Sequence, residues 1–447
     1  MSKTASAKEP FIRIRRRGAT SFLYRTSVRV VAILFALLIG TFFLQGVGKI
    51  GFGEVWKCYF DGSMIDQTTK LSFWKECMLL LLISLALTPA FKMRFWNIGG
   101  QGQVMIGALA TSIVMFYGGK GSMSNASMII VSFLFSIIAG GIWAAIPAIF
   151  KVKLNVNETL FTLMMNYIAI VFVAASIDTW KGVGTALELF NKNTETGWLP
   201  GVGENPYGLI IIAVLAITVL LSVYMKHTKQ GYEISVVGES LKTARYAGMN
   251  TTWIILRTVF ISGALCGLCG FFYIAGIDHC LKEGVSGNYG FTAIIVSWAS
   301  SFNPYGMLII TMLITFLSNG TVAVADAVGN LTNAQYITVG ILLFFLIGCE
   351  FFIQYQIIYN TKLQTKFDNA KEKIHNAMPW WFAFWSKCAK SIDDAILKVH
   401  TWISVQLQKL KESLVKIFKK KDQPSEVNEK DNTEVKDENK EEVSNNG

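Results

Sequence analysis

Charged residues are scarce in this chain of 447 residues. Asp, Glu, Lys and Arg make up only 16% of it, whereas 52% of the residues are apolar and 13% are aromatic. A soluble domain usually carries about 25% charged residues. Most of the charge also lies toward the two ends, so the central part of the chain is more apolar still. This scarcity excludes an ordinary soluble domain and predicts an all-α polytopic membrane protein.

Recognisable catalytic motifs are also lacking. No G-x-x-x-x-G-K-[ST] loop is present, because the nearest run, Gly118 to Ser122, lacks the leading glycine and a preceding strand. With only four histidines, the chain offers no zinc-peptidase motif and no Ser/His/Asp or paired-carboxylate arrangement. We therefore expect no catalytic residues, no cofactor, and no ATP hydrolysis by the chain itself.

Cysteines are few and scattered, and they suggest no disulfide framework. Cys266 and Cys269 have C-x-x-C spacing, but their apolar run also holds three glycines, which favours close helix packing over metal or redox chemistry. The Asp278 to Cys280 run near Glu283 is typical of a polar loop, so no metal site is predicted. The net charge of +11 comes from basic residues beside apolar segments, and no nucleic-acid motif accompanies it, so nucleic-acid binding is not expected.

Apolar runs predict about ten transmembrane helices, since a helix needs about 20 residues to cross a bilayer. The predicted spans are Val30–Gly48, Met78–Phe91, a segment ending at Tyr117, Ala126–Phe150, Thr159–Ile177, Tyr207–Met225, Thr258–Ile277, Phe291–Phe302, Pro304–Ala325 and Tyr336–Cys349. The first span lacks a small-residue cleavage site and is interpreted as an uncleaved anchor. The predicted domains are a basic N-terminus (1–29), a transmembrane domain (30–352), a basic amphipathic extension (353–421) and a disordered tail (422–447).

Basic residues predict the orientation of these spans. Six arginines between Arg13 and Arg29 precede the first span, which indicates a cytoplasmic N-terminus. Ten crossings then return the C-terminus to the cytoplasm. Beyond Phe352, apolar residues recur at helical spacing from Ile403 to Ile417 with basic residues between them, so this extension is expected to lie on membrane lipid, with a partner-binding helix as the alternative.

Two glycine-rich segments interrupt apolar runs at corresponding positions of two predicted halves. The first glycine segment, residues 97–103, contains Gly99, Gly100 and Gly102, and the second, residues 284–290, contains Gly287 and Gly290. Irregular backbone at membrane depth survives only where it is buried in protein or lines a cavity. The pattern therefore favours two re-entrant segments and an inverted repeat around a transport pathway, with ordinary connecting loops as the alternative.

Polar residues at predicted membrane depth are neutral, and the charged residues considered there fall near span ends. Amides and hydroxyls suit an uncharged, hydrogen-bonding solute, although helix–helix hydrogen bonding is the alternative role for each of them. The candidate pathway residues are Asn97, Gln101, Gln103, Asn166, Ser297 and Asn319.

Four motifs resemble bacterial ABC importer permeases of the nucleoside and simple-sugar family, which are similar to branched-chain amino acid permeases. They are Asn97 to Gly107, matching N-I-G-x-E-G-Q-x-x-x-G, Asn157 to Ala169, the loop from Gly231 to Gly248, and Gly287 to Phe291 with Asn303 to Gly306. The resemblance covers residues 28–352. Gln101 replaces the usual acidic residue, and Ser240-Leu241 replaces the usual N-P of the loop.

The resemblance implies ABC ATPase subunits that use the ATP, a second permease subunit and an extracytoplasmic substrate-binding lipoprotein. It also implies that a short helix at 241–247 transmits the ATPase motion, with these coupling residues: Gly238, Glu239, Arg245, Ala247 and Gly248. A plain connecting helix is the alternative for this loop.

Together these features predict a permease subunit of an ATP-driven importer in a bacterial cytoplasmic membrane, with nucleosides as the expected solute. A simple-sugar or branched-chain amino acid permease is the alternative within the same class. A stand-alone secondary carrier is disfavoured by the lack of ionisable relays. A membrane scaffold organised by the C-terminal extension is the third possibility.

Overall fold

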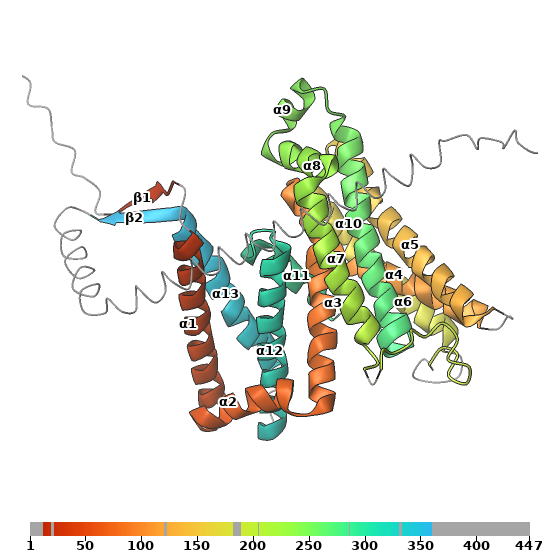
Figure 1. Ribbon diagram of the computed structural model, residues 1–447, viewed down its shortest axis with the longest axis horizontal. Helices are drawn as coiled ribbons and strands as arrows, with labels where there is room; N and C mark the ends of the chain where they lie inside the picture. Colours follow the sequence, from red (N-terminus) through yellow and green to blue (C-terminus); the bar gives the residue numbers. More distant parts are fainter. Residues whose placement is uncertain are drawn as a thin grey trace, which may run out of the picture. The chain divides into compact units, whose positions relative to one another are not determined.

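The structure is a computed structural model that describes residues 12–18, 22–119, 123–181, 189–203, 205–285, 287–329 and 333–359. The described helices are α1 (Phe22–Gly48), α2 (Phe52–Phe60), α3 (Gln67–Lys92), α4 (Gly100–Gly118), α5 (Asn125–Leu154), α6 (Glu158–Trp180), α7 (Gly208–His227), α8 (Lys229–Glu239), α9 (Leu241–Tyr246), α10 (Thr251–Tyr273), α11 (Tyr289–Ala299), α12 (Pro304–Val328) and α13 (Ala334–Gln354) (Figure 1). Two short π-helical turns, η1 (Asp61–Ile65) and η2 (Ile274–Asp278), extend α2 and α10.

Two compact units divide the chain. The larger unit comprises Arg16–Thr20 and Tyr24–Gln356, and it holds nearly all of the described helices. Most of the strands β1 (Ile12–Arg16) and β2 (Tyr355–Tyr359), which pair in a two-stranded sheet, belong to the smaller unit. The predicted C-terminal extension and tail lie outside the described residues from residue 360 onward.

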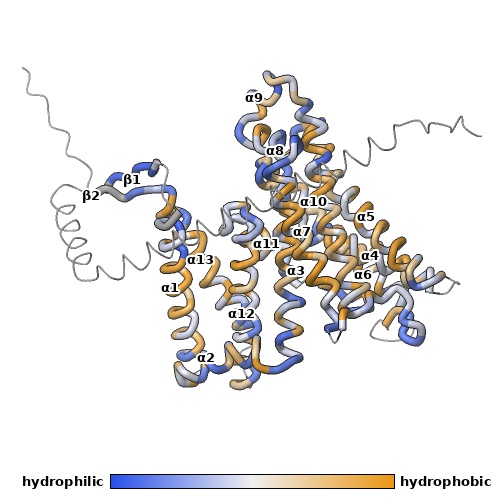
Figure 2. Tube along the Cα trace, viewed as in Figure 1, coloured by the Kyte–Doolittle hydropathy of each residue, from blue (hydrophilic) through white to orange (hydrophobic). Residues whose placement is uncertain are grey.

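The long helices confirm an all-α polytopic membrane protein. Among the described residues, eight helices are long and apolar enough to cross a membrane: α1, α3, α5, α6, α7, α10 with η2, α12 and α13. The helices α4 and α11 account for the other two predicted spans. Figure 2 shows hydrophobic residues along these helices and hydrophilic residues around α8. The inverted repeat and the domain boundaries stay predictions.

Helices α3 and α10 form the centre of the larger unit. The most apolar window of each is 72% buried, against 28% for α1, α5 and α13. Helix α10 packs against α3, α4 and α5. The contact with α5 depends on Gly267, because a Cβ there would lie 2.2 Å from the carbonyl oxygen of Ser136. The predicted role of the small residues around Cys266 and Cys269 in close packing is thereby supported.

Several helix starts follow from the local sequence. Asn157 caps α6 by accepting hydrogen bonds from the backbone N–H groups of Thr159 and Leu160. Asn303 caps α12 in the same way, and Pro304 occupies the first turn, where its missing N–H costs nothing. The tight turn before it places Ser301 and Phe302 at φ values of 52° and 60°. The chain therefore reverses direction directly between α11 and α12, as the sequence predicts.

Three elements differ from the expected pattern. Helix α3 begins at Gln67, whereas the predicted span begins at Met78. The prediction began too late because the first turns of α3 carry a polar face that lowers the local hydropathy. Helix α2 was not expected as a helix. It is amphipathic and buries Tyr59 against Gly320 of α12. The loop between α7 and α10 contains the additional helix α8 before the expected short helix α9.

Candidate functional site: glycine segments and a polar cavity

The first glycine segment is held by an amide network. Asn97 is fully buried, and its Nδ2 donates to Gln103 Oε1 at 3.2 Å, while Gln103 Nε2 donates to Asn97 Oδ1 at 3.0 Å. Asn97 Nδ2 also lies 3.4 Å from Ser262 Oγ. Ser262 is the twelfth of the 23 residues of α10, so this segment lies halfway along a membrane-crossing helix.

Asn166 of α6 fixes the same segment from the other side. Its Oδ1 accepts a hydrogen bond from the Gly102 N–H at 2.8 Å, and its Nδ2 donates to the Ile98 carbonyl at 3.0 Å. A Cβ on Gly102 would lie 2.9 Å from Asn166 Cα, so only glycine permits this approach. Side chains of α4 and α6 therefore hydrogen-bond with the break between α3 and α4, which explains how polar backbone is tolerated at this depth.

Gln101 joins the two glycine segments. Its Oε1 accepts a hydrogen bond from the Gly290 N–H at 3.0 Å, and its Nε2 donates to the Gly287 carbonyl. A Cβ on Gly290 would lie 2.6 Å from Gln101 Oε1, so glycine is required at this contact. The Trp96 and Trp298 rings, 4.9 Å apart between centroids, add a second contact between the loop before α4 and α11. The two predicted segments are therefore in direct contact.

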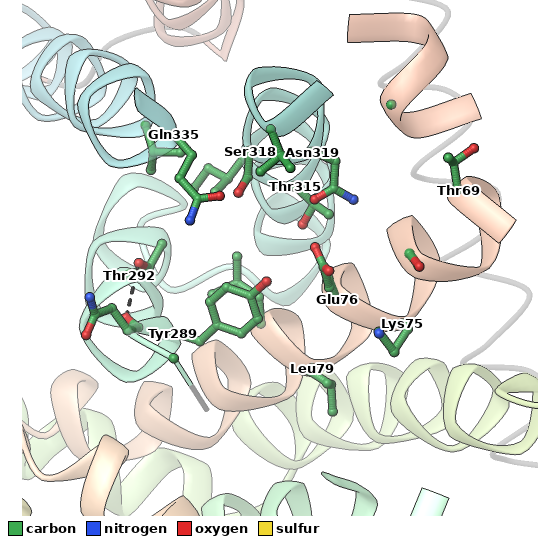
Figure 3. A pocket seen from close by; sticks show the side chains of 18 of the residues that line it. Thr69, Lys75, Glu76, Leu79, Tyr289, Thr292, Thr315, Ser318, Asn319 and Gln335 are labelled. Atoms are coloured by element: carbon green, nitrogen blue, oxygen red, sulfur yellow. Dashed lines mark hydrogen bonds between the residues drawn. The ribbon is translucent and has the colours of Figure 1, made fainter. Parts of the chain in front are cut away.

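A cavity of about 650 Å³ lies beside this contact, between α3, η1, the end of α10, α11, α12 and α13. Figure 3 shows Glu76 of α3, Tyr289 of α11 and Asn319 of α12 on its wall. The three side chains come from three different helices and line the same part of the cavity. Thr315, Ser318 and Gln335 complete a lining that is rich in hydroxyl and amide groups.

The charge of the cavity wall is unevenly compensated. The Lys75 ammonium lies 5.6 Å from the centre of the Tyr207 ring, where a cation–π contact stabilises it. Asp278 pairs with Lys282 at 3.1 Å, and Asp326 is exposed. Since three acidic side chains and Lys75 line the cavity, its field favours neutral or cationic solutes over anions.

Tyr273 of α10 also lines the cavity, and its side chain is only 6% exposed. Its hydroxyl group has no hydrogen-bond partner among the described residues. Because this oxygen is itself inaccessible, the Tyr273 hydroxyl group lies behind the cavity surface, and other atoms of the residue form the wall.

Of the six candidate pathway residues, Asn319 lines this cavity. Asn97, Gln101, Gln103 and Asn166 build the loop framework, and Ser297 Oγ donates to the Ser84 carbonyl at 2.8 Å. Contact of these residues with a solute stays a prediction. Gly287 of the second glycine segment lines the cavity.

Glu76 and Tyr273 are two of the cavity residues that were not expected from the sequence. Glu76 precedes the apolar run of α3 and was placed outside the span by hydropathy. A signal was nevertheless available, because Thr69, Ser72 and Glu76 recur at helical spacing on one face. All three of these residues line the cavity.

The predicted coupling residues lie on α8, α9 and the turn that follows. Gly238 is buried, and a Cβ on it would lie 2.1 Å from the Lys92 carbonyl oxygen at the end of α3. Helix α8 is also tied to α10 by the ion pair between Glu233 and Arg257 at 3.0 Å. These contacts connect the loop directly to the two central helices.

The far side of the same loop is exposed. Glu239, Arg245, Ala247 and Gly248 are all exposed, and Gly248 ends α9 with a φ of 74°. The neighbouring Tyr246 side chain is 90% exposed. The predicted short helix is confirmed, whereas its contact with an ATPase stays a prediction.

Membrane-crossing helices, a hydrogen-bonded break at mid-depth and a polar cavity beside it together define a membrane permease. The chain belongs to the family of permease components of branched-chain amino acid transport systems, since residues 71–347 match that family. This match confirms the family resemblance carried by the four motifs.

Several relatives share most of this length. The chain is 26% identical over 350 residues to a glucose ABC transporter permease of Haloferax volcanii, a match that covers 73% of this chain and 88% of the relative. It is 26% identical over 309 residues to a nucleoside ABC transporter permease of Lactococcus lactis, covering 66% and 83%. It is also 26% identical over 336 residues to a guanosine ABC transporter permease of Bacillus subtilis, covering 71% and 92%. The relatives are thus transport components rather than enzymes, and a location in the cytoplasmic membrane is consistent with them.

Proposed function

We propose that this chain is the permease subunit of an ATP-driven importer for nucleosides. The observation that carries the proposal is the cavity, which combines hydroxyl, amide and carboxyl groups with tyrosine rings. A nucleoside presents sugar hydroxyls to the polar groups and a flat base to an aromatic ring. The cavity volume of about 650 Å³ lies within the roughly 300–1,000 Å³ of small-molecule sites.

The proposed partners follow from the family. ATPase subunits would bind the exposed surface of α8 and α9, a second permease subunit would complete the pathway, and a binding lipoprotein would deliver the solute. Because Gly238 contacts the end of α3 at Lys92, movement of α8 would pass along α3 to Glu76, which lies on the same helix. This route connects ATP hydrolysis in the partner to the cavity wall.

The proposed orientation places α8 and α9 in the cytoplasm. Lys226, Lys229, Lys242 and Arg245 gather at this end, which follows the excess of basic residues in cytoplasmic loops. The cavity is lined by the opposite ends of α3 and α12, where Thr69 and Asp326 lie. In this orientation the cavity faces the outside of the cell, and both termini lie inside.

A simple-sugar permease is the second candidate, because sugars offer the same hydroxyl groups and one relative is a glucose permease. A branched-chain amino acid offers an ammonium group to Glu76 but few partners for the remaining hydroxyls and amides. Uptake of labelled guanosine, glucose and leucine by cells expressing the complete transporter separates the three. We expect guanosine uptake that requires ATP and this chain. Uptake of glucose or leucine without guanosine would overturn the proposal.

A further inference from the structure

We propose that the Glu76 carboxylate binds the vicinal diol of the solute and thereby selects ribonucleosides over 2′-deoxyribonucleosides. The inference rests on the proposed function and deepens it. A vicinal diol occurs in the ribose of a nucleoside and in a free sugar, so both sources share the chemistry that Glu76 would recognise.

The hydrogen-bonding capacity of Glu76 supports this assignment. A carboxylate is an acceptor with about four lone-pair sites on two oxygens. Glu76 lines the cavity with Tyr289 of α11 and Asn319 of α12, and no ion pair with Glu76 is present among the described residues. Its acceptor sites suit two adjacent hydroxyl donors. Acidic side chains bind the ribose 2′-hydroxyl in this way in dinucleotide-binding folds.

The residues around Glu76 provide a second observation. Tyr289 and Thr292 of α11 and Thr315 and Ser318 of α12 line the same cavity (Figure 3). Because their hydroxyl groups can both donate and accept, they can pair with further polar groups of a bound solute.

Charge disfavours an alternative reading of this cavity as an anion site. Glu76, Asp278 and Asp326 line it together with Lys75, and Lys282 pairs with Asp278, so three acidic groups face two basic ones. A phosphorylated solute would meet this acidic wall at a cost, since like charges repel in a partly buried site. The assigned ligand is therefore an unphosphorylated diol.

The experiment uses the complete transporter and measures the uptake of guanosine and of 2′-deoxyguanosine. The uptake of glucose and of 2-deoxyglucose is measured in parallel. We expect the wild-type chain to favour guanosine over its deoxy analogue. Glu76→Gln should lower guanosine uptake about tenfold or more, because hydrogen bonds to charged groups are strong, and change deoxyguanosine uptake much less. A larger effect on the glucose pair would instead assign the diol to a free sugar.

Asp326→Asn is the matched control, because it removes an exposed carboxylate of the same cavity that lies outside the Glu76 cluster. It should leave the ribo-to-deoxy ratio unchanged. Since the same lipoprotein serves every variant, a changed ratio reports on this chain. An equal loss of both nucleosides in Glu76→Gln, or the same shift in Asp326→Asn, would overturn the proposal.

Glu76→Asp keeps the proposal testable should Glu76→Gln fail to reach the membrane. It retains the carboxylate but shortens the side chain by one methylene group, so it should lower guanosine uptake about fivefold and deoxyguanosine uptake less, as expected for one lost hydrogen bond. An unchanged ribo-to-deoxy ratio would count against the site. Absence of any nucleoside or sugar uptake by the wild-type chain would instead overturn the proposed function itself.

Discussion

Replacing Gln101 by alanine should separate the two glycine segments. The change removes the hydrogen bonds to the Gly290 N–H and the Gly287 carbonyl and leaves a buried N–H unpaired. Each bond is worth about 0.6–1.7 kcal/mol between membrane helices, and an unpaired buried group costs about 1–3 kcal/mol. The unpaired group is counted in place of its own lost bond, so one bond and one unpaired group weaken the contact by about 2–5 kcal/mol.

Hydrogen exchange measures this effect directly. Where opening is a pre-equilibrium, a loss of 2–5 kcal/mol corresponds to about 30- to 5,000-fold faster exchange at the Gly290 amide. Gln103→Ala is the matched control, because it removes two amide hydrogen bonds to Asn97 within the first segment and none to the second. Uptake per copy should fall further in Gln101→Ala than in this control. Unchanged exchange at Gly290 in Gln101→Ala, or equal acceleration in both variants, would refute the reasoning.

Three further predictions concern the two ends of the molecule. Gly238→Ala places a Cβ 2.1 Å from the Lys92 carbonyl oxygen, so it should lower the free energy of unfolding by about 1–3 kcal/mol and reduce ATP-driven uptake. Gly340→Ala is the control, because its Cβ meets nothing within 4 Å, and it should change neither quantity. Tyr246→Ala removes a side chain that is 90% exposed. We expect this variant to copurify with less ATPase and to keep the same melting temperature. Retained copurification would contradict the proposed contact. Burial against Trp198 lowers the pKa of His279, so the folded state favours the neutral imidazole, and stability should be lost as the pH falls below the ordinary value of 6.5. Melting curves from about pH 7.5 to about pH 5 should show a shallower loss for His279→Gln, and parallel curves would contradict this assignment.

The sequence was sufficient to locate all eight described helices that are long and apolar enough to cross a membrane, because long apolar runs are a strong signal. It was less informative where a helix combines polar and apolar faces. Thr69, Ser72 and Glu76 in the first turns of α3 line the cavity. A hydropathy average takes in all faces of the helix and therefore hides this polar face. Helix α2 was missed for the same reason, since only Val55 and Tyr59 are buried on its nine residues.

The candidate site shows a related limit. The sequence indicated that Asn97, Gln101 and Asn166 are important at membrane depth, and each forms defined hydrogen bonds there. Hydropathy cannot distinguish an amide that binds protein from one that faces a cavity, because both interrupt an apolar run. That distinction depends on contacts between segments far apart in the chain, such as Gln101 with Gly290.

Accessibility of the cavity tests the central claim most directly. Ser318 lines the cavity, so Ser318→Cys in a chain without its other cysteines places one thiol on its wall. We predict that a membrane-impermeant maleimide labels it from outside the cell and that guanosine slows the labelling, whereas Thr243→Cys on the exposed face of α9 stays unlabelled from that side. Labelling of Ser318→Cys that proceeds only from inside, or that guanosine leaves unchanged, would contradict a solute pathway through this cavity.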